Sequence, residues 1–390
     1  MFNRNFFSFL LVCLLTLPRS LIQSLMMISI PNLIEQLDLT DLESQLIVPI
    51  FVLGSILFIP LAGFFGDKLG AKKILIYSTY IYVGASFLAG IAATGKELLI
   101  CIFLMGAAAG SSITQGSTYI TELYPIQYRG RVIGIYSSLI TLTFFLGPVL
   151  GGIVANFGQK GVYWSMLPVM VLALYLSRIL PNFYKEKSED RKREYRVFGS
   201  LSFLSHCFIA CLWQVILTSI TFFPAQYQIY SQLSPLEAGV LFTVLSLPIT
   251  IFSPIAGWLF DRIGFFIPYL IGYAALSIGW VFSYYDYDRE AVVMYCVALG
   301  FIMPVSGSAS WGFFEQRHRS FATAIYYIFR FLGAFAGGLF GGYLLTAQIE
   351  SSEVFYLTFS LGLSIVIITL PLVFWVKKIK PLGIQNRTKT

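Results

Sequence analysis

The chain has 390 residues, of which 57% are hydrophobic and only 12% are charged, and its formal net charge is +7. Soluble domains carry charge on about a quarter of their residues, so this composition excludes an ordinary soluble protein and indicates an integral membrane protein. Basic and aromatic residues are not interleaved, so no nucleic-acid partner is expected. The sequence has no phosphate-cradling Gly-x-x-x-x-Gly-Lys loop, which argues against an ATP-driven pump.

The charged residues leave long gaps along the chain, and these gaps locate the membrane spans. A bilayer core about 30 Å thick needs roughly 20 apolar residues in a helix. Eight uncharged stretches are long enough: 44–66, 74–95, 98–121, 132–159, 238–260, 263–285, 291–314 and 354–376. Further spans are predicted at 6–30, 161–180, 320–346 and within 197–236. The sequence therefore predicts an all-α membrane protein with twelve transmembrane helices.

Two of these segments need interpretation. The segment 6–30 could be a cleaved signal peptide, but Pro18 and Arg19 interrupt it and no small-residue cleavage site follows, so a retained first helix is expected. The stretch 197–236 ends in a polar segment, 226–235, which is predicted to be an outer loop that follows one tilted helix.

The distribution of Lys and Arg predicts the orientation. With the amino terminus inside, only Lys96, Lys160 and Arg289 of the 26 basic residues fall outside, while Arg19 and Arg330 lie within spans. Because cytoplasmic loops of membrane proteins are enriched in Lys and Arg, both termini are expected in the cytoplasm. We expect a multi-pass monomer of the cytoplasmic (inner) membrane, with the lipid bilayer as its surroundings.

Neither a cofactor nor a metal is expected. The five cysteines all lie within predicted spans, where cysteine acts as a small apolar residue. His206, Cys207 and Cys211 could be read as metal ligands, but neither a carboxylate nor a second histidine lies nearby in the sequence. No Ser/His/Asp constellation occurs at membrane depth, so the chain is not expected to be an enzyme.

The two halves of the chain repeat one another. Residues 58–70 align without gaps with residues 252–264, sharing Phe, Pro, Ala, Gly, Asp and a final Gly. A second match pairs Arg129 with Arg319 and Gly147 with Gly337. Parallel repeats of this kind are common in transporters. The predicted organisation is an N-terminal six-helix bundle (1–181), a charged cytoplasmic linker (182–198), a C-terminal six-helix bundle (199–380) and a cytoplasmic tail (381–390).

These motifs resemble those of the major facilitator superfamily. The stretch Gly63-x-x-x-Asp67-Lys68-x-Gly70 looks like its signature loop between helices 2 and 3, and Asp261-Arg262-x-Gly264 looks like the weaker copy between helices 8 and 9. The spacing of Glu122 and Arg129-Gly130-Arg131 is similar to the turn between helices 4 and 5, and Gly147-Pro148-x-x-Gly151-Gly152 resembles the end of the helix 5 motif of drug:proton antiporters. The chain departs from the pattern at Ile102 or its neighbours, where an arginine is expected within helix 4, and at Ser138, where the helix 5 motif usually starts with glycine.

The resemblance implies two six-helix bundles that expose a central site to each side in turn. It also implies that Asp67 bonds to a neighbouring helix end and to arginines such as Arg129, which would hold an inner gate shut. Alternatively, these residues only cap helices and define topology. The candidate inner-gate residues are Gly63, Asp67, Lys68, Gly70, Glu122, Arg129, Asp261, Arg262 and Gly264.

Small residues recur in the predicted helices 5 and 11 at a spacing that suits close helix packing. Pro148 removes one backbone hydrogen bond and is expected to kink helix 5. The candidate packing residues are Gly147, Pro148, Gly151, Gly152, Gly337 and Gly341.

Two arginines are predicted at membrane depth, where ionisable residues are costly and mark functional sites. Arg19 lies about 20 Å from the inner end of its helix, and Arg330 about 16 Å past Arg319. No Asp or Glu is predicted at the same depth. Our hypothesis is that the two arginines face one central cavity and bind an anion; alternatively, each bonds to backbone carbonyls or snorkels. The candidate substrate-binding residues are Arg19, Gln23, Gln115, Gln214, Tyr326 and Arg330.

The sequence thus favours a secondary transporter of a small organic anion or zwitterion, such as a carboxylate metabolite or chelator, with a coupling proton or a counter-substrate as a further partner. A proton-coupled drug efflux antiporter is the alternative; it usually needs a membrane-embedded acid, for which Glu122 is the only nearby candidate. A sensor of the same fold that moves no substrate is a third interpretation.

Overall fold

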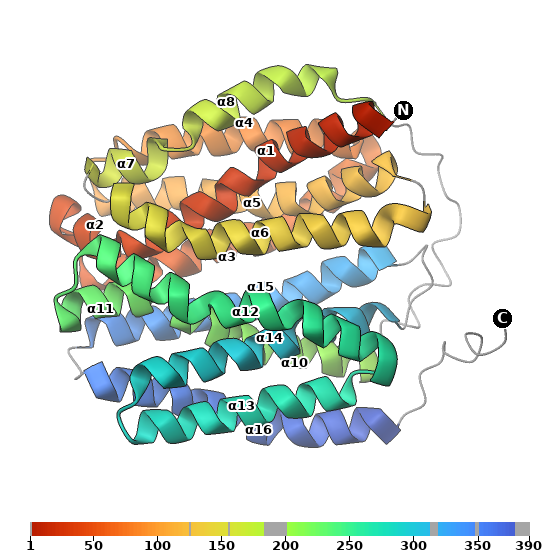
Figure 1. Cartoon of the computed structure of the whole chain (residues 1–390). Coiled ribbons are helices and arrows are strands. Elements are labelled where there is room, and N and C mark those ends of the chain that lie inside the picture. The colour runs from red at the N-terminus through yellow and green to blue at the C-terminus, as the bar shows by residue number, and fades with distance from the viewer. Residues whose placement is uncertain are drawn as a thin grey trace. The chain divides into compact units, whose positions relative to one another are not determined.

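The computed structural model describes residues 2–124, 126–154, 157–182, 201–312, 319–347 and 351–378, and in these ranges the regular structure is helical (Figure 1). The helices are α1 (Phe2–Ile28), α2 (Ile30–Leu37), α3 (Asp41–Leu69), α4 (Ala71–Ala89), α5 (Gly95–Leu123), α6 (Ile126–Val154), α7 (Gly158–Trp164), α8 (Leu167–Leu176), η2 (Ser177–Ile179), α10 (Leu201–Ile220), α11 (Phe223–Ser231), α12 (Pro235–Ile263), α13 (Phe266–Tyr284), α14 (Asp288–Gly312), α15 (Arg319–Thr346) and α16 (Ser351–Lys378).

The helices account for the predicted membrane spans. Ten helical segments among the described residues are long and apolar enough to cross a bilayer, two of which join shorter helices: α7 with α8 and η2, and α10 with α11. The helices α4 and α6, of 19 and 29 residues, complete the twelve predicted spans. α1 continues through Pro18 as one helix.

The chain divides into two compact units. Unit 1 comprises residues 1–186, 221–244 and 338–347, and unit 2 comprises residues 187–220, 245–337 and 348–390. The predicted linker from residue 183 onward and the predicted tail lie outside the described residues, so the predicted domain boundaries stay a prediction.

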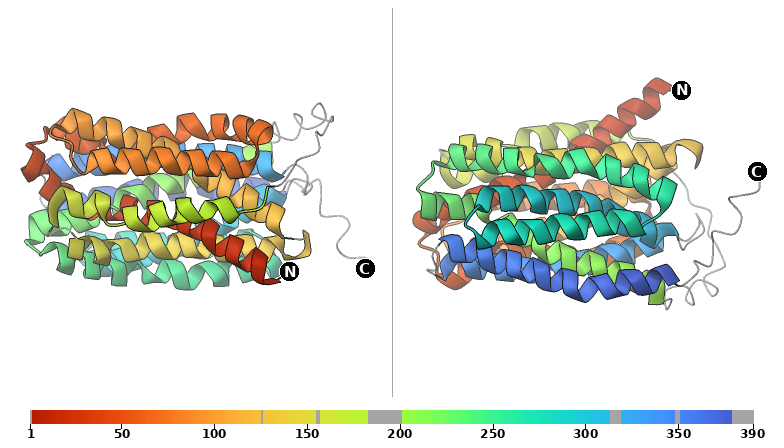
Figure 2. Two further views of the ribbon diagram at one scale, coloured as in Figure 1. Left: turned by 90° about the horizontal axis from the view of Figure 1, so that it is seen from above. Right: turned by 60° about the horizontal axis from the view of Figure 1, so that its bottom comes forward.

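Each unit contains the same helix pairs, which is what an internal repeat requires. In unit 1, α5 packs on α4 and on α1, and α8 packs on the same two helices. In unit 2, α14 packs on α13 and on α10, and α16 packs on the same two helices; Figure 2 shows α13 and α16 side by side. If the spans are numbered from the first helix of each half, both units pair span 4 with spans 3 and 1, and span 6 with the same two spans.

The second span of each half begins with the same capping arrangement. The Thr40 hydroxyl accepts a hydrogen bond from the Glu43 backbone N–H at 3.3 Å, and the Glu43 carboxylate accepts one from the Thr40 N–H at 3.0 Å. Ser234 and Glu237 make the same two bonds, at 3.3 and 2.9 Å. A capping box satisfies backbone donors that the first helical turn leaves free. The motif is legible in the sequence as Thr/Ser-x-x-Glu, but our sequence reading missed it.

The prediction of an outer loop over 226–235 is wrong for its first six residues, which belong to α11. Pro224 lies in the first turn of this helix, where its missing N–H costs nothing. Gln228 donates to the Ile28 carbonyl oxygen at 2.8 Å, and Gln226 is only 1% exposed. The polar side chains therefore pack against protein, and their polarity did not indicate a solvated loop.

Candidate functional site

Arg330 lies in α15 of unit 2 and is held by α10. Its Nε and Nη2 atoms both donate to Oε1 of Gln214, at 3.0 and 2.7 Å. The Gln214 Nε2 atom lies 3.4 Å from the Thr218 hydroxyl, one turn along α10. The guanidinium carbon lies 5.9 Å from the ring centre of Tyr326 and 5.7 Å from that of Tyr327, within the range of cation–π attraction. Three predicted binding residues, Gln214, Tyr326 and Arg330, therefore lie together.

The partner of Arg330 is a neutral amide, and this decides what the cluster can do. A carboxylate at position 214 would cancel the guanidinium charge, whereas the amide holds the guanidinium in place and leaves its charge uncompensated. No described carboxylate pairs with Arg330, and its Nη1 atom has no described acceptor. The side chain is half-buried. Tyr326 is oriented by a 2.8 Å hydrogen bond with Ser306 of α14. The arrangement presents an oriented positive charge flanked by two aromatic rings.

Arg19 lies in α1 of unit 1 and is almost completely buried, with 1% of its surface exposed. Its Nη2 atom donates to the Thr79 hydroxyl of α4. Its guanidinium carbon lies 5.4 Å from the ring centre of Tyr82, also in α4. Its Nε and Nη1 atoms are buried without an acceptor among the described residues. A buried charge without a counter-ion lowers the stability of the fold. Stability alone therefore does not explain why an arginine occupies position 19.

Two other predicted binding residues contribute differently. Gln115 of α5 is 4% exposed and donates to the Ala62 carbonyl oxygen of α3 at 3.0 Å, so it ties two helices of unit 1 together. Gln23 is half-buried, one helical turn after Arg19. The hypothesis that Arg19 and Arg330 face one cavity stays a prediction.

The two predicted gate loops have the same local geometry. Gly70 and Gly264 adopt left-handed backbone conformations, with φ of 89° and 78°, which glycine adopts without strain. Each donates its N–H to the carbonyl oxygen four residues earlier, at 2.9 Å in both loops. Lys68 and Arg262 both lie over the aromatic ring four residues earlier, Phe64 and Trp258, at 4.1 and 4.2 Å. Both cations are exposed.

The remaining predicted gate residues are only partly described. The side chains of Asp67, Arg129 and Asp261 lie outside the described residues, so the proposed bond between Asp67 and Arg129 stays a prediction. Glu122 is half-buried near the end of α5. Gly63 is exposed on α3, and a Cβ added there would meet no atom within 4 Å.

Four of the predicted packing glycines in the fifth and eleventh spans lie against the first span of the corresponding half. A Cβ at Gly147 or Gly151 of α6 would overlap residues of α1, namely Ser24 and Ile28. A Cβ at Gly337 of α15 would come within 2.9 Å of the Val215 backbone of α10, and one at Gly341 would overlap Phe222. Gly152 lies against the Pro235–Leu236 backbone, and the carbonyl oxygen of Pro148 lies against Gly239, within unit 1.

The Gly337→Ala variant is expected to be destabilised by roughly 1–3 kcal/mol. The added methyl group would overlap the α10 backbone, which cannot move aside by a change of rotamer as a side chain can. Thermal unfolding in detergent, followed by intrinsic fluorescence, measures this. The matched control is Gly84→Ala on the exposed face of α4, where no atom lies within 4 Å. This control should melt at the same temperature as the native protein or higher, because alanine favours a helix. An unchanged melting temperature for Gly337→Ala would contradict the packing assignment.

His206 is fully buried in α10, and its imidazole ring is oriented by aromatic neighbours. Its Nδ1 atom lies 3.1 Å from the Tyr269 hydroxyl, and the two rings are stacked. The stack continues through Tyr273 to Trp213, with ring centres 6.1 and 5.6 Å apart. Among the described residues, no group of three His, Cys, Asp or Glu side chains could hold a metal. This column forms part of the core of unit 2.

Comparison with known proteins identifies the family. The model of the Major Facilitator Superfamily matches residues 12–285 and 202–389. The chain belongs to the Major Facilitator Superfamily. This is the family that the loops at 63–70 and 261–264 and the internal repeat resemble.

Similar proteins agree with this assignment. Quinolone resistance protein NorA of Staphylococcus aureus (strain MRSA252) is 24% identical over 363 residues, which cover 87% of this chain and 90% of NorA. Multidrug resistance protein 3 of Bacillus subtilis (strain 168) is 28% identical over 154 residues, which cover 39% of this chain and only 29% of that relative. The chain thus spans less than a third of the length of several curated relatives that it matches.

A solved structure with the same fold is a bacterial homolog to the human lysosomal transporter Spinster, in an inward-facing and occupied conformation. It has a TM-score of 0.76 at 14% sequence identity and covers 95% of this chain and 96% of that chain. Together with the twelve spans and the matched helix pairs, this confirms the predicted all-α fold of two repeats.

Within this superfamily fold, sequence reasoning missed two residues around Arg19. Thr79 and Tyr82 lie 60 and 63 positions along the chain, on the buried face of α4. Each is a hydroxyl-bearing residue in the middle of an apolar span. Several other spans also carry such residues, so this feature did not single out Thr79 and Tyr82.

Proposed function

We propose that this transporter carries a small organic anion, or a zwitterion with a carboxylate, by alternating access. Its place would be the cytoplasmic (inner) membrane, with both termini in the cytoplasm, as the Lys and Arg distribution predicts. A coupling proton or a counter-substrate would complete the cycle. The observation that carries the proposal is the hydrogen bonding of Arg330 to Gln214, because it orients a guanidinium inside a span without neutralising it.

The charge balance of the described spans supports an anion. Arg19 and Arg330 have no described carboxylate partner, and a charged group at membrane depth is retained where it has a function. A planar guanidinium binds carboxylates with two parallel hydrogen bonds, and the rings of Tyr326 and Tyr327 offer an apolar surface to the carbon skeleton of a substrate. The remaining candidate residues, Gln23, Gln115 and Arg19, stay predicted substrate contacts.

Proton-coupled drug efflux is the second candidate, and the similarity to NorA over most of both chains favours it. A cation carrier would need an acid at depth, and Glu122, half-buried near the end of α5, is the described carboxylate that suits this role best. If drug efflux is the function, Glu122→Gln should abolish resistance while Arg330→Gln leaves it intact. A sensor without flux would show binding but no exchange in liposomes.

The inner gate is proposed to work as the family resemblance implies. The loops at Gly70 and Gly264 would release and re-form contacts of Asp67 and Asp261 as the site opens inward, with Arg129 as a partner of Asp67. The exposed Lys68 and Arg262, held over Phe64 and Trp258, would face the lipid headgroups and anchor the two loops at the membrane surface.

Substitution of Arg330 tests the proposal directly. The purified chain in liposomes should exchange a labelled carboxylate by counterflow, an assay that requires no knowledge of direction or coupling. Arg330→Gln should raise the half-saturation concentration about 30-fold or more, because removal of one partner of a buried charge pair costs roughly 2 kcal/mol or more. Arg330→Lys should recover part of the activity, because it restores charge but not the planar fork. Carboxylate exchange that persists unchanged in Arg330→Gln would overturn the assignment.

A further inference from the structure

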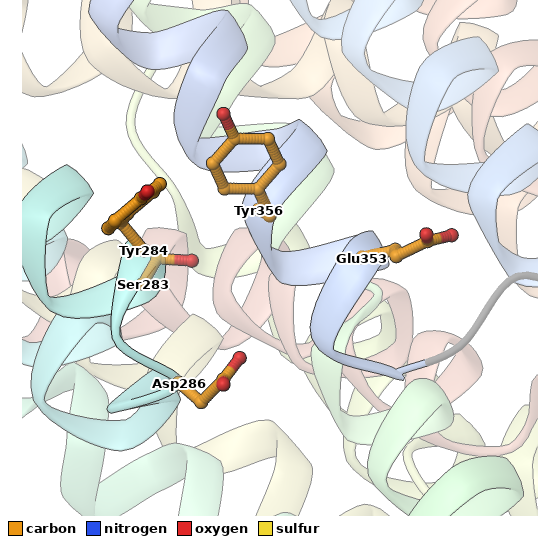
Figure 3. Close-up of a pocket in the computed structure, with 5 residues that line it drawn as sticks. All are labelled: Ser283, Tyr284, Asp286, Glu353 and Tyr356. Atoms are coloured by element: carbon orange, nitrogen blue, oxygen red, sulfur yellow. The ribbon is translucent and has the colours of Figure 1, made fainter.

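A small open pocket lies where α13 ends and α16 begins, within unit 2. Its volume is about 220 Å³, and its lining residues are Ser283, Tyr284, Asp286, Glu353 and Tyr356. Figure 3 shows the Ser283 hydroxyl directed toward α16, with Tyr284 and Tyr356 above it, Asp286 below it and Glu353 on the first turn of α16 at the right. Since the sequence predicts that α13 ends on the outer face, we expect the pocket to open there.

The aromatic side chains of the pocket contact one another and are anchored by a hydrogen bond. The rings of Tyr284 and Tyr356 have centres 6.4 Å apart, and the Trp280 ring centre lies 5.8 Å from that of Tyr284 and 6.4 Å from that of Tyr356. Trp280 is itself anchored, since its Nε1 atom lies 3.3 Å from the Ser360 hydroxyl of α16. Three aromatic side chains from two helices therefore form a continuous wall.

The polar side carries negative charge and a buried hydroxyl that lacks a partner. Asp286 and Glu353 are exposed, and neither has a described cation partner. Ser283 is only 2% exposed, and its Oγ atom is buried without a hydrogen-bond partner among the described residues. A buried hydroxyl normally finds a partner, and Ser283 lines the pocket, so a ligand seated there can supply one.

We propose that this pocket binds an organic ammonium group. The aromatic faces attract a cation through their quadrupoles, the two carboxylates compensate its charge, and the Ser283 oxygen accepts one N–H hydrogen bond. An inorganic cation fits less well, because hard metal ions need oxygen ligands on several sides and the tyrosine rings cover one of them. The ammonium group could belong to a free amine or to an amine headgroup of a lipid, both of which reach this face of the membrane.

The site is independent of the anion proposal. Arg330 selects negative charge through a guanidinium, whereas this pocket selects positive charge through carboxylates and rings. Its test therefore uses binding of a cation and not transport of an anion.

The experiment titrates ethanolamine onto the purified full-length chain in detergent and follows binding by saturation-transfer NMR. Binding is expected, and the Asp286→Asn/Glu353→Gln double variant should weaken it about tenfold or more, as should Tyr356→Leu. The matched control is Glu290→Gln, which removes a nearby exposed carboxylate that does not line the pocket. If Tyr356→Leu fails to fold, Tyr356→Phe, which retains the aromatic face, should bind as the native protein does, and the double variant still decides.

A second arm distinguishes the source of the ammonium group. Native mass spectrometry of the chain with phosphatidylethanolamine or phosphatidylglycerol should show retained ethanolamine lipid, lost in the double variant, if the headgroup is the ligand. Binding of free ethanolamine without lipid retention assigns the site to a soluble amine. The proposal is overturned if ethanolamine does not bind, if the double variant binds as the native chain does, or if Mg²⁺ displaces ethanolamine at lower concentrations than ethanolamine itself requires.

Discussion

The Gln214→Glu variant is expected to lose affinity for a carboxylate substrate by about 100-fold or more while the protein stays folded. Glutamate has the shape of glutamine, so it can take both hydrogen bonds from Arg330 that the amide takes now. The new carboxylate would neutralise the guanidinium and repel an anion that approaches it. Counterflow of a labelled carboxylate in liposomes, together with the melting temperature, measures both effects.

The opposite result is equally informative. If the substrate is a cationic drug, Gln214→Glu adds an acid at membrane depth, and drug efflux should persist or increase. Gln214→Ala serves as the matched control: it removes the hydrogen bonds that orient Arg330 but leaves its charge, so the affinity for an anion should fall less than in Gln214→Glu. Equal affinity in the native protein and Gln214→Glu would show that Arg330 does not bind the transported anion.

The Arg19→Met variant is expected to melt about 2 to 8 °C higher than the native protein in the absence of substrate. Arg19 is 1% exposed, and two of its nitrogens lack acceptors among the described residues, so its charge is buried at a cost that methionine avoids. Residues that cost stability at such depth are retained for function. Thermal unfolding with and without a carboxylate ligand measures the trade-off.

A ligand should stabilise the native protein but not Arg19→Met if Arg19 contributes to the anion site. Thr79→Val is the matched control, since it removes the acceptor of the Arg19 Nη2 atom and leaves the charge buried. This control should therefore melt below the native protein. A lower melting temperature for Arg19→Met than for the native protein would mean that Arg19 is a satisfied structural residue.

Most of the fold was predictable because the bilayer restricts what a chain can do. Within the hydrocarbon layer the backbone must satisfy its own hydrogen bonds, so gaps between charges translate directly into helices. The repeat was predictable from the residues 58–70 and 252–264, and the structure adds that Gly70 and Gly264 both have a positive φ. The loop predicted over 226–235 was wrong for residues 226–231, because polarity was taken to mean solvent, whereas Gln228 bonds to the backbone of α1.

The candidate site was only partly predictable. Helical spacing placed Tyr326 and Tyr327 near Arg330, because residues three and four apart share a face of a helix. It could not pair Arg330 with Gln214, which lies 116 positions earlier on α10. Nor did it indicate that Gln115 is used to join α5 to α3.

The sequence by itself determined the fold of twelve helices in two repeated halves and the family, and it predicted two arginines at membrane depth. Those features depend on composition and on periodicity along one chain, which the bilayer converts into helices. Only the tertiary structure decided that Arg330 is held by a neutral amide and that Arg19 is enclosed by Thr79 and Tyr82. The physical reason is that helical periodicity specifies which face a residue occupies, whereas the residue opposite is set by how side chains from other helices pack.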